Sequence, residues 1–195
     1  MKHYFKNSEQ LHEEDEITLA YRYYDHDLCF KTNNNLFSKN ELDYHSRLLL
    51  AHIEAGTYQH CLDLGCGYGF IGICLSKRFK TAVDFIDITP QAIIYTEKNI
   101  ILNNISAYKV TQSDGIQNET KYDLITLNPP IHAGKEVCYR LYQEGVAHLQ
   151  RTGIMMIVIA KKHGAVSTLA YLKTFCDVKI ITKKKGVYIM ALCKK

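Results

Sequence analysis

Residues 63–72, "DLGCGYGFIG", combine a carboxylate with closely spaced glycines directly behind an apolar run. The last six letters satisfy the GxGxxG pattern of dinucleotide-binding loops, and Asp87 lies 20 residues after Gly67. The first five letters, from Asp63 through Gly65 to Gly67, satisfy instead the DxGxG pattern typical of loops that bind S-adenosylmethionine (SAM). Closely spaced glycines are costly unless a backbone must approach a ligand, so this stretch predicts a binding loop.

Charge separates the two ligands. A dinucleotide places a diphosphate anion at the turn from the first strand into the helix, where the carboxylate of Asp63 would repel it. SAM carries an ammonium and a sulfonium group, and a carboxylate at that strand end attracts both, directly or through water. Asp63 therefore favours SAM. A nicotinamide dehydrogenase is the weakest candidate, because nothing beyond the glycines supports hydride chemistry.

Polar residues also follow the next two predicted strands. Asp87 ends the second strand, where a carboxylate can accept hydrogen bonds from both ribose hydroxyls, and Ile88 beside it offers an apolar face to adenine. Asp114, in "QSDGI" after the third strand, can accept a hydrogen bond from the adenine amino group. Taken alone, each aspartate is more often a turn or capping residue. Together, at the ends of successive strands, they predict a pocket for SAM.

The segment "LITLNPPIHAGK", residues 124–135, places two of the three prolines directly behind Asn128. Proline lacks an N–H and fixes φ, so the pair stiffens the loop and leaves its carbonyls without a local donor. The side-chain oxygen of Asn128 and the carbonyl of Pro129 could each accept one N–H of a nucleobase amine and aim its lone pair at the methyl group. Asn-Pro alone is a common turn. The catalytic interpretation depends on its position at the fourth strand end, after the DxGxG loop.

The sequence thus predicts two groups of site residues. The cofactor-binding group is Asp63, Gly65, Cys66, Gly67, Asp87, Ile88, Asp114, Gly115 and Asn128. The catalytic group is Asn128, Pro129, Pro130 and Ile131. No metal site is predicted, since the seven cysteines are scattered without a CxxC pair and suit free thiols in a reducing cytoplasm.

Strand and helix patterns alternate from residue 60 onward. The expected strands are 60–64, 82–88, 107–112, 122–127, 153–160, 178–184 and 186–193. The expected helices are 70–79, 90–103, 136–150 and 165–175. This order predicts an α/β fold with a doubly wound, mostly parallel sheet of seven strands, in which the last two strands are antiparallel.

The first part of the chain differs from the rest. Residues 16–24 and 27–32 alternate apolar and polar positions and predict an antiparallel hairpin. Ser38 and Glu41 form a capping-box pattern, which predicts a helix over 39–55. We expect one domain over the 195 residues, with a hairpin extension over 1–35 and a SAM-binding core over 36–195.

Composition excludes a membrane span and a secretory leader. No run approaches about 18 apolar residues, and the polar, acidic start has no apolar core, so a cytoplasmic location is expected. Residues 1–160 carry a net charge of −4, whereas 161–195 hold nine lysines and one aspartate, a net charge of +8. Such a basic segment either attracts phosphate backbones or forms a solvated face, and the sequence leaves both open.

The segment "NPPIHAGK" resembles the NPPFHAG-type motif of the RsmC-type small-subunit ribosomal RNA guanine-N2 methyltransferases. The resemblance also covers "HYF" at 3–5, "NLFSKNELDYHSRLLL" at 35–50, "CLDLGCGYGFIG" at 61–72 and "GIMMIVIAKKHG" at 153–164. It implies a Rossmann-like class I methyltransferase fold, SAM as donor, and a guanine 2-amino group of ribosomal RNA, free or in the small subunit, as acceptor. Long family members carry a second, degenerate domain.

By resemblance, the glycine loop and its neighbouring aspartates bind SAM, and the Asn-Pro-Pro loop forms the acceptor site. One departure is Ile131, because the usual motif has an aromatic residue there that can stack on a flipped base. His132 and Lys135 either contact the base or a phosphate, or face solvent. Acceptors such as adenine N6 or a protein glutamine stay open, as does a SAM- or RNA-binding module without turnover.

Overall fold

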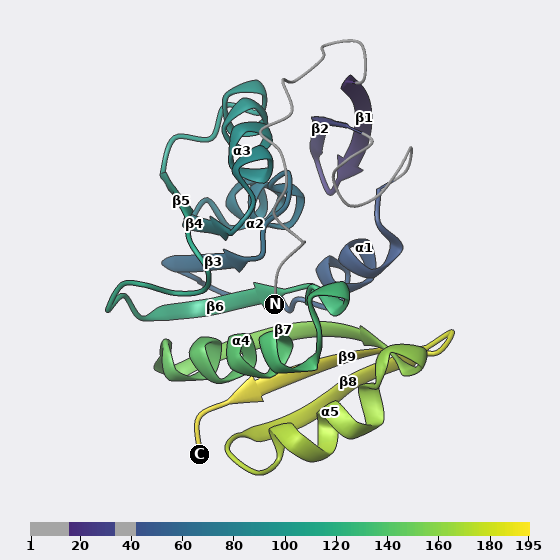
Figure 1. Ribbon diagram of the computed structural model, residues 1–195. Helices are drawn as coiled ribbons and strands as arrows, with labels where there is room; N and C mark the ends of the chain where they lie inside the picture. Colours follow the sequence, from purple (N-terminus) through teal and green to yellow (C-terminus); the bar gives the residue numbers. More distant parts are fainter. Residues whose placement is uncertain (1–15, 34–41) are drawn as a thin grey trace.

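A computed structural model describes residues 16–33 and 42–195, which form a seven-stranded sheet flanked by helices and a separate two-stranded hairpin (Figure 1). The strands are β1 Glu16–Tyr23, β2 His26–Asn33, β3 His60–Leu64, β4 Ala82–Asp87, β5 Tyr108–Gln112, β6 Tyr122–Leu127, β7 Leu149–Ala160, β8 Asp177–Lys184 and β9 Val187–Cys193. The helices are α1 Tyr44–Leu50, α2 Phe70–Phe79, α3 Pro90–Leu102, α4 Lys135–Ala147 and α5 Ala165–Leu172, with short 3-10 helices η2 Ile131–Ala133 and η3 Lys161–His163. The predicted doubly wound sheet and the hairpin are confirmed.

The strand order of the large sheet is β5-β4-β3-β6-β7-β9-β8. The pairs from β5 to β7 are parallel, and β9 runs antiparallel to β8, as the sequence predicts. Strand β9 also runs antiparallel to β7. The chain builds outward from β3 to β5 and then returns to β6, so the order reverses between β3 and β6. Open parallel sheets bind ligands at such a switch point, beyond the carboxyl ends of the strands.

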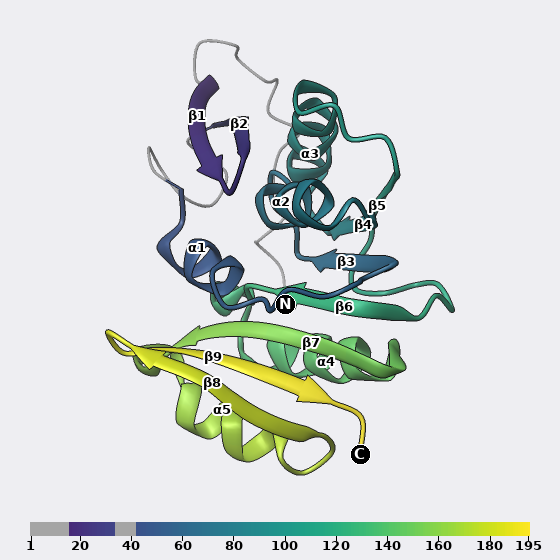
Figure 2. The ribbon, with the colours of Figure 1, turned by 180° about the vertical axis from the view of Figure 1, so that it is seen from behind.

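Each face of the sheet carries its own hydrophobic core. Residues of α1, α2, α3 and the hairpin pack on one face, and residues of α4 and α5 pack on the other. Figures 1 and 2 show the resulting three layers from opposite sides. The central strands are apolar at nearly every position because both of their faces are covered. All seven cysteines are free thiols, and five of them are buried.

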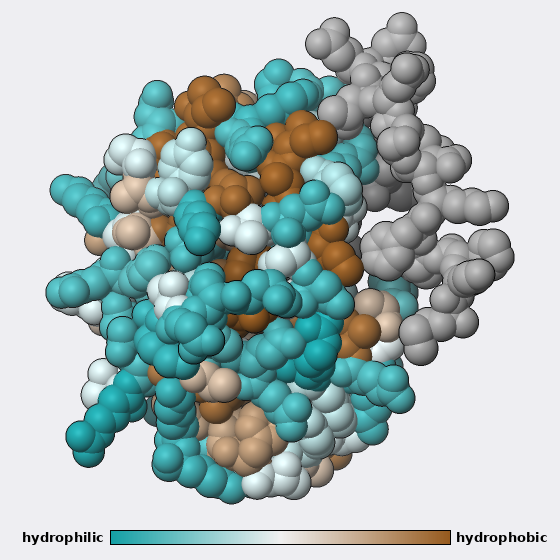
Figure 3. All heavy atoms as spheres, turned by 60° about the vertical axis from the view of Figure 1, so that its left-hand side comes forward, coloured by the Kyte–Doolittle hydropathy of each residue, from teal (hydrophilic) through white to brown (hydrophobic). Residues whose placement is uncertain are grey.

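The face of the molecule drawn in Figure 3 is mostly hydrophilic, with apolar side chains set among polar ones. The most exposed large apolar side chains include Ile101 and Leu102 on α3, at 72% and 41% of their full exposure. Within residues 16–33 and 42–195, no helix has the length and apolar character needed to cross a bilayer.

Asn99 of α3 and Asn103, the C-cap of that helix, attach the hairpin to the core. The side chain of Asn99 accepts from the N–H of Lys31 (2.7 Å) and donates to its carbonyl (2.8 Å). Asn103 makes the same pair of bonds to Cys29, at 3.0 and 2.7 Å. The two amides thus take the place of a neighbouring strand along the edge of β2. The Asn99 amide also donates to the carbonyl of Tyr68 (2.8 Å), so one residue joins the hairpin to the glycine loop.

Asn99→Ala is expected to lower the free energy of unfolding by about 2–4 kcal/mol, because it removes the partner from three backbone groups around a fully buried side chain. Urea denaturation measures the change. Glu97→Ala, at an exposed position of the same helix, is the matched control and should stay near the parent value. Equal stability of the two variants would contradict a structural role for Asn99.

The helix predicted over 39–55 is shorter in the structure. It begins at Tyr44, and Asp43 is its N-cap, with a carboxylate that accepts from the backbone N–H of Ser46 at 2.7 Å. It ends at Leu50 and continues as turns. The expected capping box lies at 38–41, outside the described residues, as does "HYF". The prediction was wrong in its bounds because Asp43 is a strong N-cap in the middle of the same helical pattern.

Candidate active site

The glycine loop joins β3 to α2 and folds back over the end of β4. Gly65, Gly67 and Gly69 have φ angles of 70°, 58° and 83°, a region that favours glycine. The N–H groups of Gly65 and Cys66 both donate to the carbonyl of Ile86, at 2.7 and 3.0 Å. A Cβ added at Gly67 would meet no atom within 4 Å, so this part of the loop borders open space. A ligand can therefore approach the backbone of the loop at Gly67.

Asp63 lies beneath this loop and is almost fully buried, at 1% exposure. Its carboxylate accepts from the N–H of Gly72 at 2.8 Å and from the hydroxyl of Thr126 at 3.2 Å. Burial raises the pKa of Asp63 to about 7, and these two hydrogen bonds oppose the rise. A carboxylate with so little solvation attracts a cation strongly, which fits the positively charged part of SAM.

Asp87 holds the loop from the end of β4. One carboxylate oxygen accepts from the N–H of Gly67 and the other from the N–H of Thr89, both at 2.9 Å. Each oxygen has a second lone pair, so the side chain can still accept two hydroxyl groups. Ile88 follows it and is 39% exposed, as a residue that packs on a ligand would be.

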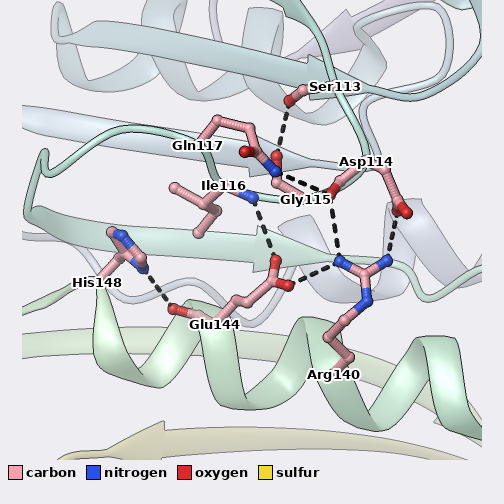
Figure 4. Close-up of polar contacts among 8 residues, drawn as sticks. All are labelled: Ser113, Asp114, Gly115, Ile116, Gln117, Arg140, Glu144 and His148. Atoms are coloured by element: carbon pink, nitrogen blue, oxygen red, sulfur yellow. Dashed lines mark hydrogen bonds and ion pairs between the residues drawn. The ribbon is translucent and has the colours of Figure 1, made fainter.

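Asp114 follows β5 and is tied to α4 (Figure 4). Arg140 forms an ion pair with its carboxylate and donates to its backbone carbonyl at 3.2 Å. Arg140 also bonds Glu144 at 2.7 Å, and Glu144 accepts from the N–H of Ile116 at 3.1 Å. Gly115 has a φ of 87°, and a Cβ there would collide with Glu144 and Arg140. Helix α4 therefore fixes the loop that is expected to bind adenine. The sequence alone did not indicate this contact.

Arg140→Gln is expected to weaken SAM binding several-fold, because Asp114 loses the cation that fixes its orientation and the loop loses one bond to α4. Isothermal calorimetry with SAM measures the effect. Arg151→Gln removes the same charge from an exposed position and is the matched control. If both variants bind SAM as the parent does, the clamp does not contribute to the cofactor site.

Asn128 follows β6, directly beside the glycine loop, since Leu64 and Leu127 are paired at the ends of β3 and β6. Its amide nitrogen donates to the carboxylate of Asp43 at 2.9 Å and to the hydroxyl of Ser46 at 3.0 Å. Both amide hydrogens thus have acceptors on α1 and its cap. No donor among residues 16–33 and 42–195 bonds to the amide oxygen, so this oxygen can accept from a ligand.

The Pro-Pro segment forms a tight turn. The carbonyl of Pro129 accepts from the N–H of Ile131 and that of Pro130 from the N–H of Ala133, both at 2.9 Å. The prediction that these carbonyls lack a local donor was wrong. Pro130, with φ −75° and ψ 77°, forms an inverse γ-turn that brings the Ile131 N–H back to Pro129. The Pro130 carbonyl also accepts from the thiol of Cys138 at 3.6 Å, whereas the Pro129 carbonyl keeps a second lone pair for another donor.

The residues after the prolines face two directions. Ile131 is half-buried and packs against the core under α4. His132 and Lys135 are exposed, and the ammonium of Lys135 lies 5.0 Å from the ring centre of Tyr139. The segment after the prolines therefore combines a half-buried aliphatic residue with exposed basic side chains.

Comparison with known proteins identifies the family and the fold. The model of the methyltransferase small domain matches residues 27–191. The chain belongs to this family. An uncharacterized protein of Bacillus subtilis, YbxB, is 34% identical over 195 residues, which cover 97% of this methyltransferase and 96% of YbxB. Ribosomal RNA small subunit methyltransferase C of Mannheimia succiniciproducens is 36% identical over 129 residues, 63% of this chain and 38% of that protein.

A solved structure gives the same fold. The 16S rRNA methyltransferase RsmC of T. thermophilus, in complex with AdoMet and guanosine, superposes with a TM-score of 0.81 at 20% identity, over 93% of this chain and 51% of that one. This methyltransferase thus spans about half or less of the RsmC proteins that it matches. It is an RsmC-like class I methyltransferase domain, and the family agrees with SAM as the cofactor.

Proposed function

We propose that this methyltransferase transfers the methyl group of SAM to the exocyclic 2-amino group of a guanine in ribosomal RNA. The observation that carries the proposal is Asn128, whose amide hydrogens are engaged by Asp43 and Ser46 so that its oxygen remains for an incoming amine. The similarity to ribosomal RNA methyltransferases supports the RNA acceptor and, with it, a cytoplasmic location.

The residues of the pocket fit the donor. SAM supplies an electrophilic methyl group on a positively charged sulfur. Asp63 provides a buried negative charge for a cation, and Asp87 presents lone pairs beside the open face of Gly67. Ile88 provides an exposed apolar side chain, and Asp114 provides a carboxylate fixed by α4. In this proposal residues 36–195 form the catalytic core and the hairpin is an extension.

The acceptor chemistry depends on orientation. The lone pair of an exocyclic amine is delocalised into the base, so the amine is a weak nucleophile. Asn128 accepts one N–H of the amine, and the second lone pair of the Pro129 carbonyl accepts the other. These bonds direct the nitrogen lone pair and stabilise the positive charge that develops on the nitrogen during transfer. The tight turn keeps both oxygens fixed, and Ile131 packs on the base.

Nucleoside analysis tests the acceptor. The purified protein is incubated with isotopically labelled SAM and either unmodified small-subunit ribosomal RNA or assembled subunits, and the digested nucleosides are separated by mass spectrometry. We expect label in N2-methylguanosine. Label in N6-methyladenosine, or in a glutamine of a protein present in the subunits, would replace the guanine acceptor. Tight SAM binding without label in any product would indicate a binding module.

A further inference from the structure

Basic side chains gather at the carboxyl ends of β7 and β8. Residues 161–163 form η3 directly after β7, and residues 183–185 end β8 and begin the turn into β9. The N–H of Lys161 donates to the carbonyl of Gly186 at 2.7 Å, which joins the two segments. We call this exposed surface the basic edge. It consists of Lys161, Lys162, His163, Lys183, Lys184 and Lys185.

The charge of the basic edge is not neutralised by the part of the chain that the structure describes. Among residues 16–33 and 42–195, no carboxylate forms a salt bridge with its lysines. Asp177, the one acidic residue after position 160, begins β8 and lies at the opposite end of that strand, roughly 25 Å away. Lysines concentrated in this way create a positive potential that attracts polyanions.

The basic edge is continuous with the acceptor loop. Strands β6 and β7 are neighbours, so η2 after the prolines and η3 after β7 leave the sheet side by side. Burial lowers the pKa of His163, and the charges of Lys162, His45 and His132 lower it further. Because His45 of α1 and His132 of η2 act electrostatically on His163 of η3, the three histidines lie near one another. Figures 1 and 2 both show the β8–β9 turn at the same edge of the sheet as the end of β6.

We propose that the basic edge binds the phosphate backbone of the RNA beside the target base and thereby places that base on the Asn128 loop. The inference rests on the proposed function in taking RNA as the substrate. Lysines bind phosphates as flexible point charges and fix the position of a nucleic acid without reading its sequence. An acidic protein or an anionic membrane would also be attracted, but neither needs a surface that continues into the acceptor loop.

Charge removal at the two ends of the same sheet region tests the proposal. One variant carries Lys162→Gln, Lys184→Gln and Lys185→Gln. Its matched control carries Lys173→Gln, Lys194→Gln and Lys195→Gln, which removes three charges at the opposite end, where Asp177 lies. Binding of unmodified ribosomal RNA is measured at several salt concentrations. SAM affinity of both variants serves as the check on folding.

We expect the first variant to bind RNA at least about tenfold more weakly than the parent. The plot of log association constant against log salt concentration should become less steep by about 2–3, because three phosphate contacts are lost. The control should keep the parent slope. RNA binding equal to that of the control would overturn the proposal. So would a loss of binding to phosphatidylserine vesicles with RNA binding intact, which would indicate a membrane surface.

The result of the RNA-binding measurement does not depend on which nucleoside the protein methylates. The binding measurement contains no methyl transfer, so a product other than N2-methylguanosine would overturn the guanine acceptor and leave the basic edge in place. Conversely, N2-methylguanosine formation together with unchanged RNA binding by the first variant would overturn the basic edge and leave the proposed reaction in place.

Discussion

Asn128→Ala is expected to lower the rate of methyl transfer by about 10²–10³-fold, the usual cost of losing one fixed polar group that stabilises charge in a transition state. The affinity for SAM should change far less, because in the proposed site the cation and the ribose are assigned to Asp63 of β3 and Asp87 of β4. Single-turnover kinetics with labelled SAM and calorimetry separate the two quantities. A variant that keeps more than a tenth of the parent rate would remove Asn128 from the chemistry.

Asp43 supplies a sharper test of the same site. Its carboxylate oxygen receives the amide of Asn128 and the hydroxyl and N–H of Ser46. Asp43→Ala frees the Asn128 amide to rotate, so we expect a lower rate at unchanged SAM affinity. Asp43→Asn keeps an oxygen in the same place and should restore most of the rate. Equal rates for the two variants would show that orientation of the amide is not rate-determining.

The sequence predicted the residues that stand at strand ends. Asp63 and Asp87 lie near the carboxyl ends of β3 and β4, and Asp114 and Asn128 follow β5 and β6. These four strands are neighbours in the sheet, and parallel strands bring their carboxyl ends to one edge whatever lies between them in the chain. The strand pattern was sufficient to place these four residues at one edge, because it depends on the local sequence of each strand and loop.

The residues that orient this group were not predictable in the same way. Asp43 contacts Asn128 across 85 positions, and Arg140 contacts Asp114 across 26. Such contacts are set by packing of α1 and α4 on opposite faces of the sheet. In the sequence, Asp43 reads as an ordinary helix residue. Arg140 and Glu144 read as a common i, i+4 pair on a solvated helix face.

Backbone conformation was the other limit. Two adjacent prolines suggested unpaired carbonyls, but the γ-turn at Pro130 supplies a donor from the residue two positions later. The same turn makes the loop more rigid than an open Pro-Pro segment would be. The Pro129 carbonyl already accepts one hydrogen bond within the turn, so its proposed role requires its second lone pair. The amide oxygen of Asn128 accepts no hydrogen bond from residues 16–33 and 42–195, so its proposed role does not compete with a bond of the fold.

Asp63→Asn is expected to weaken SAM binding strongly and to change how stability depends on pH. The parent carboxyl has a pKa of about 7 in the fold because it is buried, against 3.8 as the ordinary value. The folded protein therefore binds more protons than the unfolded chain between about pH 4 and pH 7, and the free energy of unfolding falls as pH rises through that range. The neutral amide can accept from Gly72 and donate to Thr126, so the variant should lack this loss.

Cation binding has the opposite pH dependence. SAM binds best to the ionised carboxylate, so the parent affinity should fall as pH drops below about 7, whereas the Asp63→Asn variant should bind weakly at pH 6 and pH 8 alike.

Asp123→Asn is the control and should bind SAM as the parent does. It alters a carboxylate that accepts two backbone N–H groups at the other end of the sheet. Equal SAM affinity of Asp63→Asn and the parent at pH 8 would show that the buried charge serves no binding role. If Asp63→Asn binds SAM more weakly but has a higher free energy of unfolding at neutral pH, the negative charge of Asp63 stabilises the SAM complex and destabilises the fold.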